Sequence, residues 1–261
     1  MSVTISTTID VDLYKKIWQS DLLISQVSEI EDLFQENKLL DEALTLKGTV
    51  MAIIDVRTFM YPCVYGDVIQ VCGWSKQYLL EEGVGFVLKH IPPADSRCLE
   101  KMQKLMSEYV KNLSEAESKL ARAIFDYQLV RSDGSHGRMI QDTLCLKRDE
   151  QGNMLYMLAM LSNATHMKRD GRQHLRLSNG REDLIYEVNN TTSEIRQLET
   201  LSSREIEIAK LIGRKMTSEE IAEKLFLSPH TVNTHRQNML RKLDMMDTLE
   251  LISFLSLYRF I

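Results

Sequence analysis

The sequence has little of what a membrane, secreted or metal-binding protein needs. No apolar run approaches the roughly 18 residues that span a bilayer, and the opening MSVTISTTIDVD has neither a basic flank nor an apolar core. The four cysteines form no C-x-x-C pair, and no histidine stands at a zinc-like spacing from any of them. We therefore expect a cytoplasmic protein with no membrane segment, no metal site and only buried or incidental thiols.

Catalytic patterns are missing as well. The sequence pairs no nucleophile with a base and contains no glycine loop suited to binding phosphate. At 261 residues, 44% hydrophobic and 26% charged, the chain is long enough for two ordinary globular domains. We expect these domains to have no catalytic residue and no cofactor.

The C-terminal quarter contains helix start signals at short intervals. Ser202-x-x-Glu205, Thr217-x-x-Glu220 and Asp247-x-x-Glu250 each have the spacing of a reciprocal capping box. Ser228-Pro229 marks a further start, because a proline at the first helical position lacks only an N–H that has no intrahelical acceptor. The spacing predicts four short helices over residues 201–258.

The third of these helices has a polar face suited to DNA. At about 100° per residue its apolar side chains fall on one side, and on the other lie His230, Asn233, Thr234, Gln237, Asn238 and Arg241. No acidic residue occurs from Ser228 to Leu243, although the chain has a formal charge of -5. A solvated face in an acidic protein would normally mix signs. Amide and guanidinium groups suit base edges, so we expect this helix to enter a DNA groove.

This segment resembles the LuxR-type (GerE-like) helix-turn-helix domain. The family pattern is matched by Leu201, Ser202, Arg204, Glu205, Thr217, Glu220, Ile221, Ala222, Leu225, Ser228, Thr231, Val232, His235, Asn238, Met239, Lys242 and Leu243. The resemblance implies a four-helix domain that binds double-stranded DNA with its third helix and forms a homodimer through its fourth. Asn233 stands where the family commonly has lysine, so no target sequence is carried over from the family.

The chemistry of the side chains, together with the resemblance, assigns their roles. We assign contact with base edges to Asn233, Thr234 and Gln237, with Arg236 and Arg241 as further candidates. Phosphates are assigned to the cationic and hydroxyl groups near helix starts and their neighbours: Thr217, Ser228, His230, Thr231, His235 and Lys242. One recognition helix reads too few base pairs for useful selectivity, so a dimer contact is assigned to Leu249, Ile252 and Leu255.

The region upstream has the pattern of an α+β domain. Strands are predicted over residues 48–56, 59–65, 121–131, 137–147 and 153–163, and helices over residues 75–81 and 94–118. Residues 10–46 are mostly helical by pattern, with one apolar face formed by Leu23, Val27, Ile30 and Phe34. That face either packs on its own domain or pairs two subunits. Short turn sequences join the last three strands into an antiparallel meander.

The order of these elements is similar to that of a PAS domain. The motifs that carry the resemblance are Val71–Ser75, Ile91–Asp95, Tyr127–Gly134 and Ser162–Thr165. It implies a sensor or dimerisation domain, with an antiparallel sheet, flanking helices and room for an unidentified small-molecule ligand. Tyr61, Trp74 and Tyr127 either line a pocket or belong to the core.

The sequence between the two domains predicts a hairpin and a hinge. Residues 174–178 and 184–188 flank the turn pair Asn179-Gly180, and the polar segment Asn189 to Ser193 follows. The predicted division is a helical segment at 1–44, the PAS-like domain at 45–167, the hairpin and hinge at 168–193, and the helix-turn-helix domain at 194–261. The surplus of acid lies upstream of Glu199, so the PAS-like domain is expected not to hold DNA itself.

Together these patterns predict a transcription regulator that binds paired DNA half-sites as a dimer. Two alternatives stay open. A response regulator would need a phosphoacceptor aspartate at the end of its third strand, whereas Asp55 ends the first predicted strand and no acidic pair precedes it. An enzyme domain with a regulatory DNA-binding tail would need catalytic residues that the sequence does not display.

Overall fold

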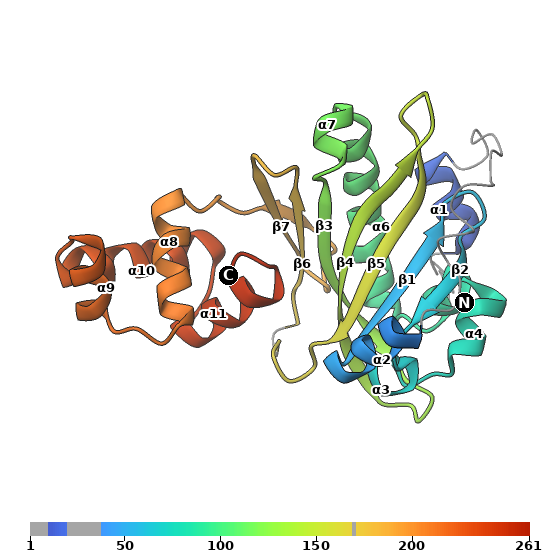
Figure 1. Ribbon diagram of the computed structural model, residues 1–261, viewed down its shortest axis with the longest axis horizontal. Helices are drawn as coiled ribbons and strands as arrows, with labels where there is room; N and C mark the ends of the chain where they lie inside the picture. The colour runs from blue at the N-terminus through green and yellow to red at the C-terminus, as the bar shows by residue number, and fades with distance from the viewer. Residues whose placement is uncertain (1–9, 20–37, 169–170) are drawn as a thin grey trace, which may run out of the picture.

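The protein consists of a large sheet with flanking helices and a separate group of four helices (Figure 1). The computed structural model describes residues 10–19, 38–168 and 171–261. It confirms the predicted α+β fold, in which an antiparallel sheet with flanking helices precedes an all-α unit. The predicted apolar face of Leu23, Val27, Ile30 and Phe34 lies outside the described residues.

The larger unit is built on an eight-stranded antiparallel sheet with the order β2-β1-β5-β4-β3-β6-β7-β8. Its strands are β1 (Thr49–Asp55), β2 (Met60–Tyr65), β3 (Arg122–Val130), β4 (His136–Arg148), β5 (Met154–Asn163), β6 (Gln173–Ser178), β7 (Asp183–Val188) and β8 (Ile195–Gln197). The first five begin and end within one residue of the predicted bounds. The strands β3, β4 and β5 form the predicted meander.

Helices of this unit precede the meander in the chain. They are α1 (Val11–Trp18), α2 (Lys38–Lys47), α3 (Val68–Cys72), α4 (Lys76–Glu82), α5 (Val84–Lys89), α6 (Pro93–Lys111) and α7 (Glu115–Ser118). The helix predicted over residues 94–118 is thus two helices, because Ser114 and Glu117 form a capping box that starts a new one. The sequence did not predict α3 and α5, which at five and six residues are too short to show a helical period. In the described part of the chain, no helix combines the length and the apolar character needed to cross a membrane.

The linking hairpin is confirmed, but the predicted hinge is wrong. Strands β6 and β7 pair from Gln173↔Val188 to Ser178↔Asp183 and add to the edge of β3. The segment Asn189 to Ser193 is an ordered turn, in which the Asn189 side-chain oxygen accepts the N–H groups of Thr191 (2.8 Å) and Thr192 (3.1 Å). It leads into β8, which pairs with β7. The polar side chains that suggested a hinge are therefore the ones that close the turn.

The boundary between the two units consequently moves from residue 194 to residues 198–202. Leu198 still belongs to the sheet unit, since its N–H donates to the Ile185 carbonyl at 2.8 Å. The four helices that follow are α8 (Ser203–Gly213), α9 (Ser218–Leu225), α10 (Pro229–Leu243) and α11 (Thr248–Leu257). Full capping boxes start α8 and α9 as predicted. The third box is only half made, because the Glu250 carboxylate accepts from Met246 N–H and Arg172 instead.

The four-helix unit packs against the outer face of the sheet, beside β6 and β7 (Figure 1). One apolar cluster runs across the junction and joins sheet residues to the helical core. Its sheet members include Ile124, Ile140 and Ile185, and its helical members include Phe254, Leu255 and Tyr258. The two units therefore share a buried apolar interface.

Ion pairs surround this interface, with Glu187 of β7 between two arginines. Its carboxylate oxygens lie 2.9 Å from Arg172 and 2.9 Å from Arg196, and His174 is 3.7 Å away. Arg196 continues to Asp244 at the C-cap of α10, at 2.6 Å. Glu187 thus helps to hold the arginines that join the sheet to the end of α10.

The position of Glu187 predicts a loss of stability in acid. Burial alone would raise its pKa, but the neighbouring His174 and the charges of Arg172 and Arg196 outweigh burial and lower the pKa from 4.5 to about 2. A lowered folded-state pKa contributes stability above the unfolded pKa, and this contribution is lost as the pH falls through the folded pKa. We expect the free energy of unfolding to fall between pH 4.5 and about 2, and Glu187→Gln to flatten that fall.

Urea unfolding at a series of pH values measures this dependence. Glu150→Gln is the matched control, because Glu150 is exposed on the turn between β4 and β5. A Glu187→Gln protein with the wild-type pH dependence would show that Glu187 is not the group responsible.

Candidate nucleic-acid interface

Helix α10 is fixed at its start and along one side. The Ser228 hydroxyl accepts the Thr231 N–H at 3.0 Å, and Pro229 occupies the first turn. Val232, Met239 and Leu243 are fully buried, as their predicted apolar side requires. The opposite side of α10 is consequently held outward by the packing of the domain.

Three residues assigned to base edges are exposed on that outward side: Asn233, Thr234 and Gln237. The Thr234 hydroxyl donates to the His230 carbonyl at 3.0 Å. The Asn233 side-chain oxygen accepts from the Ser218 hydroxyl at 2.7 Å, a contact that orients its amide group. Sequence reasoning missed Ser218, whose only sign was its position directly after the Thr217 cap.

The two arginine candidates are engaged with the protein. Arg236 is half-buried, and its guanidinium lies 3.4 Å from the Met216 carbonyl. Arg241 forms two hydrogen bonds with Glu199, at 2.5 and 3.2 Å. An ion pair so exposed to solvent contributes little to stability, so DNA could displace Glu199 from Arg241. Asn233, Thr234 and Gln237 remain the stronger candidates for base contact.

The start of α10 suits a phosphate better than the start of α9. The first turn of α10 contains no acidic residue, whereas that of α9 contains Glu219 and Glu220. The positive end of a helix dipole attracts anions, and nearby carboxylates oppose that attraction. Of the residues assigned to phosphate, those near the start of α10 are therefore best placed: Ser228, His230, Thr231 and His235. The Thr217 hydroxyl instead caps α9, accepting the Glu220 N–H at 3.2 Å.

The assignment of Lys242 to phosphate needs correction. Its ammonium nitrogen lies 2.7 Å from the carboxylate of Glu205, whose side chain is 4% exposed. Burial raises the pKa of Glu205, but the bonds from Lys242 and Ser202 outweigh it and lower the pKa overall. Lys242 therefore serves as the internal counter-charge of the α8 capping box.

The dimer assignment is corrected at one of its three residues. Leu255 is fully buried in the apolar cluster that the two units share, so it is not available for contact with a second subunit. Leu249 is 77% exposed and Ile252 is half-buried on the same helix. Met246, which is 87% exposed just before α11, extends this apolar surface.

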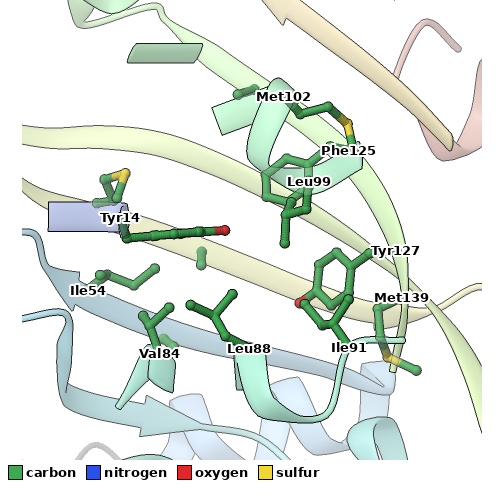
Figure 2. Packing of buried hydrophobic residues seen from close by; sticks show 14 of the residues in the cluster. Tyr14, Ile54, Val84, Leu88, Ile91, Leu99, Met102, Phe125, Tyr127 and Met139 are labelled. Atoms are coloured by element: carbon green, nitrogen blue, oxygen red, sulfur yellow. The ribbon is translucent and has the colours of Figure 1, made fainter. Parts of the chain in front are cut away.

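The sheet unit contains two small neighbouring cavities between its sheet and helices. Tyr61 and Tyr127 border both cavities, and Trp74 borders one. Figure 2 shows Tyr14 and Tyr127 extending from α1 and β3 into the packed interior, close to Leu88, Ile91 and Leu99. With volumes of about 40 and 30 Å³, the cavities have room for a few water-sized groups.

Neither the geometry nor the residues fit a phosphoacceptor site. Asp55 ends β1, in an antiparallel sheet, and its carboxylate is held by Arg57 at 2.8 and 2.7 Å. Both side chains of this ion pair are mostly buried, since Asp55 is 13% exposed and Arg57 is 10% exposed. In the ranges that the structure describes, no three histidine, cysteine or acidic side chains gather as metal ligands would.

Comparison with known proteins identifies the C-terminal domain. Residues 199–255 match the family model of bacterial regulatory proteins of the luxR family (GerE). The oxygen regulatory protein NreC of Staphylococcus carnosus is 38% identical over 71 residues, which are 26% of this chain and 33% of NreC. LiaR of Bacillus subtilis, a transcriptional regulatory protein, is 49% identical over 49 residues, 19% of this chain and 23% of LiaR. The chain thus spans a third or less of these relatives.

Solved structures with some likeness cover more of the chain. A Vibrio cholerae VqmA dimer without target DNA is 15% identical, covers 86% of this chain and 89% of its own, and has a TM-score of 0.32. VqmA bound to DPO is 14% identical over 85% of this chain and 88% of its own, with a TM-score of 0.31.

On the match to the family model, the C-terminal unit of the present protein is a LuxR-type helix-turn-helix domain.

Proposed function

We propose that this protein is a transcription regulator that binds double-stranded DNA through α10. The observation that carries the proposal is the exposed, acid-free face of that helix, anchored by three buried side chains in a LuxR-type domain. Amide and hydroxyl groups on this face suit base edges, and the start of the helix suits a phosphate. Chromosomal DNA as partner would place the protein in the cytoplasm.

The binding unit in this proposal is a homodimer on two half-sites. One recognition helix reads only a few base pairs, and two-fold related helices read half-sites about one helical turn apart. Leu249, Ile252 and Met246 form the exposed apolar surface that supports pairing. A protein truncated to its helical domain would then keep its preference for the same DNA sequence. It would lose any control of DNA binding by the upstream unit.

The PAS-like unit serves in this proposal as the sensor of a small uncharged molecule. Among the described residues, the side chains that line these two cavities are uncharged, and they include Tyr61, Gln103, Tyr127 and Gln141. An ionised ligand would have no counter-charge there and would lose its hydration. Tyr61 and Tyr127 border both cavities, so a ligand larger than a few atoms must move them.

Replacement of Gln237 tests the DNA contact. We expect Gln237→Ala to cost about 1–3 kcal/mol on the preferred site and to relax base choice at one position, because a lost bidentate contact removes discrimination there. Site selection from random DNA followed by fluorescence anisotropy measures both quantities. Gln151→Ala, at an exposed turn of the sheet unit, is the matched control. Equal losses on preferred and random DNA would contradict a base-reading role for Gln237.

A further inference from the structure

A buried charged cluster lies where the sheet meets the helix-turn-helix domain. Its centre is Asp126 of β3, which is fully buried. One carboxylate oxygen accepts from Lys168 (2.9 Å), from the backbone N–H of His174 (2.8 Å) and from the hydroxyl of Tyr258. The other oxygen accepts from Arg138 at 2.8 Å. A carboxylate so far from water is stable only with such a set of donors.

Tyr258 brings the helix-turn-helix domain to this cluster. It follows α11 directly and is fully buried, with its ring centroid 4.5 Å from that of Phe254. Its hydroxyl bonds Asp126 and lies 3.3 Å from Lys168, while its carbonyl accepts from Arg176 of β6 at 2.5 Å. The end of α11 is thereby fixed to two strands of the sheet at once.

A second attachment holds the end of the recognition helix. Arg172 lies 3.1 Å from the carbonyl of Asp244, the C-cap of α10, and 3.1 Å from the carboxylate of Glu250 in α11. The base-reading side chains stay exposed with both attachments in place. Docking therefore leaves the DNA-binding face open and fixes its direction relative to the sheet.

Strand β3 links these attachments to the cavities. Successive side chains of a strand point to opposite faces, so Asp126 faces the helix-turn-helix domain while Phe125 and Tyr127 face the interior. Tyr127 borders both cavities, and its hydroxyl bonds Gln141 of β4 at 3.0 Å. A molecule that displaced Tyr127 would thus act on the strand that carries Asp126.

We propose that Asp126, Tyr258 and Arg172 form a latch that positions the recognition helix. Whether the cavities are empty or occupied then sets how far apart two such helices lie in a dimer. The three are positioning residues, and none of them needs to touch DNA. The consequence for DNA rests on the proposed function, whereas the positioning itself can be measured without DNA.

The first experiment measures the position of the helix-turn-helix domain relative to the sheet unit in the full chain. A donor and an acceptor fluorophore are attached at Gln151 and Lys224, which are exposed on the sheet unit and on α9. We expect one narrow distribution of transfer efficiency for the wild type and a broadened or shifted one for Tyr258→Phe and for Arg172→Ala. Tyr78→Phe and Arg181→Ala are the matched controls, since both residues are exposed and lie outside the latch. Wild-type distributions for both latch variants would overturn the proposal.

The second experiment asks whether the latch selects the spacing of half-sites. A rigid dimer should bind a probe with its best spacing roughly tenfold more tightly than one with about 5 base pairs added, because half a helical turn rotates one half-site away. We expect Tyr258→Phe to reduce that ratio to about two- or threefold, while affinity for a single half-site stays unchanged. An unchanged ratio would overturn the proposal. A wild type without selective DNA binding would refute the proposed function, and the fluorescence result would still decide the latch.

Discussion

Leu255→Glu is expected to unfold the helix-turn-helix domain, whereas Leu249→Glu is expected to leave it folded and to abolish cooperative DNA binding. The two residues stand on the same helix, but Leu255 is fully buried and Leu249 is 77% exposed. Truncating a buried leucine costs about 2–5 kcal/mol, and an unpaired buried carboxylate adds to that cost. Substitution at an exposed position usually changes stability by less than about 0.5 kcal/mol.

Chemical unfolding of the full chain and titration of a probe with two half-sites separate these outcomes. A folded Leu255→Glu protein would contradict the buried position of that side chain. Unchanged cooperativity in a folded Leu249→Glu protein would place the dimer contact elsewhere, with the sheet unit as the next region to test.

Arg138→Met is expected to lower the free energy of unfolding by about 3–5 kcal/mol, because a buried ion pair broken on one side leaves an uncompensated charge. Arg138 is 6% exposed and lies 2.8 Å from Asp126 and 3.6 Å from Asp95. Burial raises the pKa of Asp95, and Arg138 opposes that rise. Methionine keeps much of the volume of arginine but offers no donor to either carboxylate.

The pH dependence of this variant identifies the cause of its loss. Without Arg138, both carboxylates should have raised folded-state pKa values, so the destabilisation should be smaller in mild acid than at neutral pH. Urea unfolding at about pH 5 and about pH 7 measures the difference. Arg181→Met is the control, since Arg181 is exposed and lies 3.9 Å from Glu117. A loss that is equal at the two pH values would point to packing instead of charge.

The parts of the fold that depend on local interactions could be predicted from the sequence. The caps at Ser202, Thr217 and Ser228 each accept from the N–H three residues further on, so their spacing alone indicated three helix starts. The turn at Asn179-Gly180 indicated the hairpin for the same reason, and Gly180 adopts a φ of +84° there. The apolar side of α10 followed from the helical period.

Interactions between distant segments could not be predicted in this way. Asp126 and Tyr258 are 132 positions apart, and Lys168 stands 42 positions from Asp126. One small sign was present in the sequence, because β3 reads RAIFDYQLV and places Ile124 on the same face as Arg122, Asp126 and Gln128. In the structure Ile124 is buried against the helical domain, which covers that face. The partner that covers the outer face became evident only from the packing.

The two edge strands of the sheet determine how readily the protein aggregates at high local concentration. Among the described residues, the outermost strands are β2 and β8. Strand β2 contains Pro62, which has no N–H to donate, and pairs with β1 through an irregular register, while β8 is three residues long. Long, regular edges recruit strands from other molecules and lead to aggregation, and prolines or short strands prevent this. Copies gathered at neighbouring sites on one DNA molecule should therefore meet through their helices and resist joining their sheets into fibres.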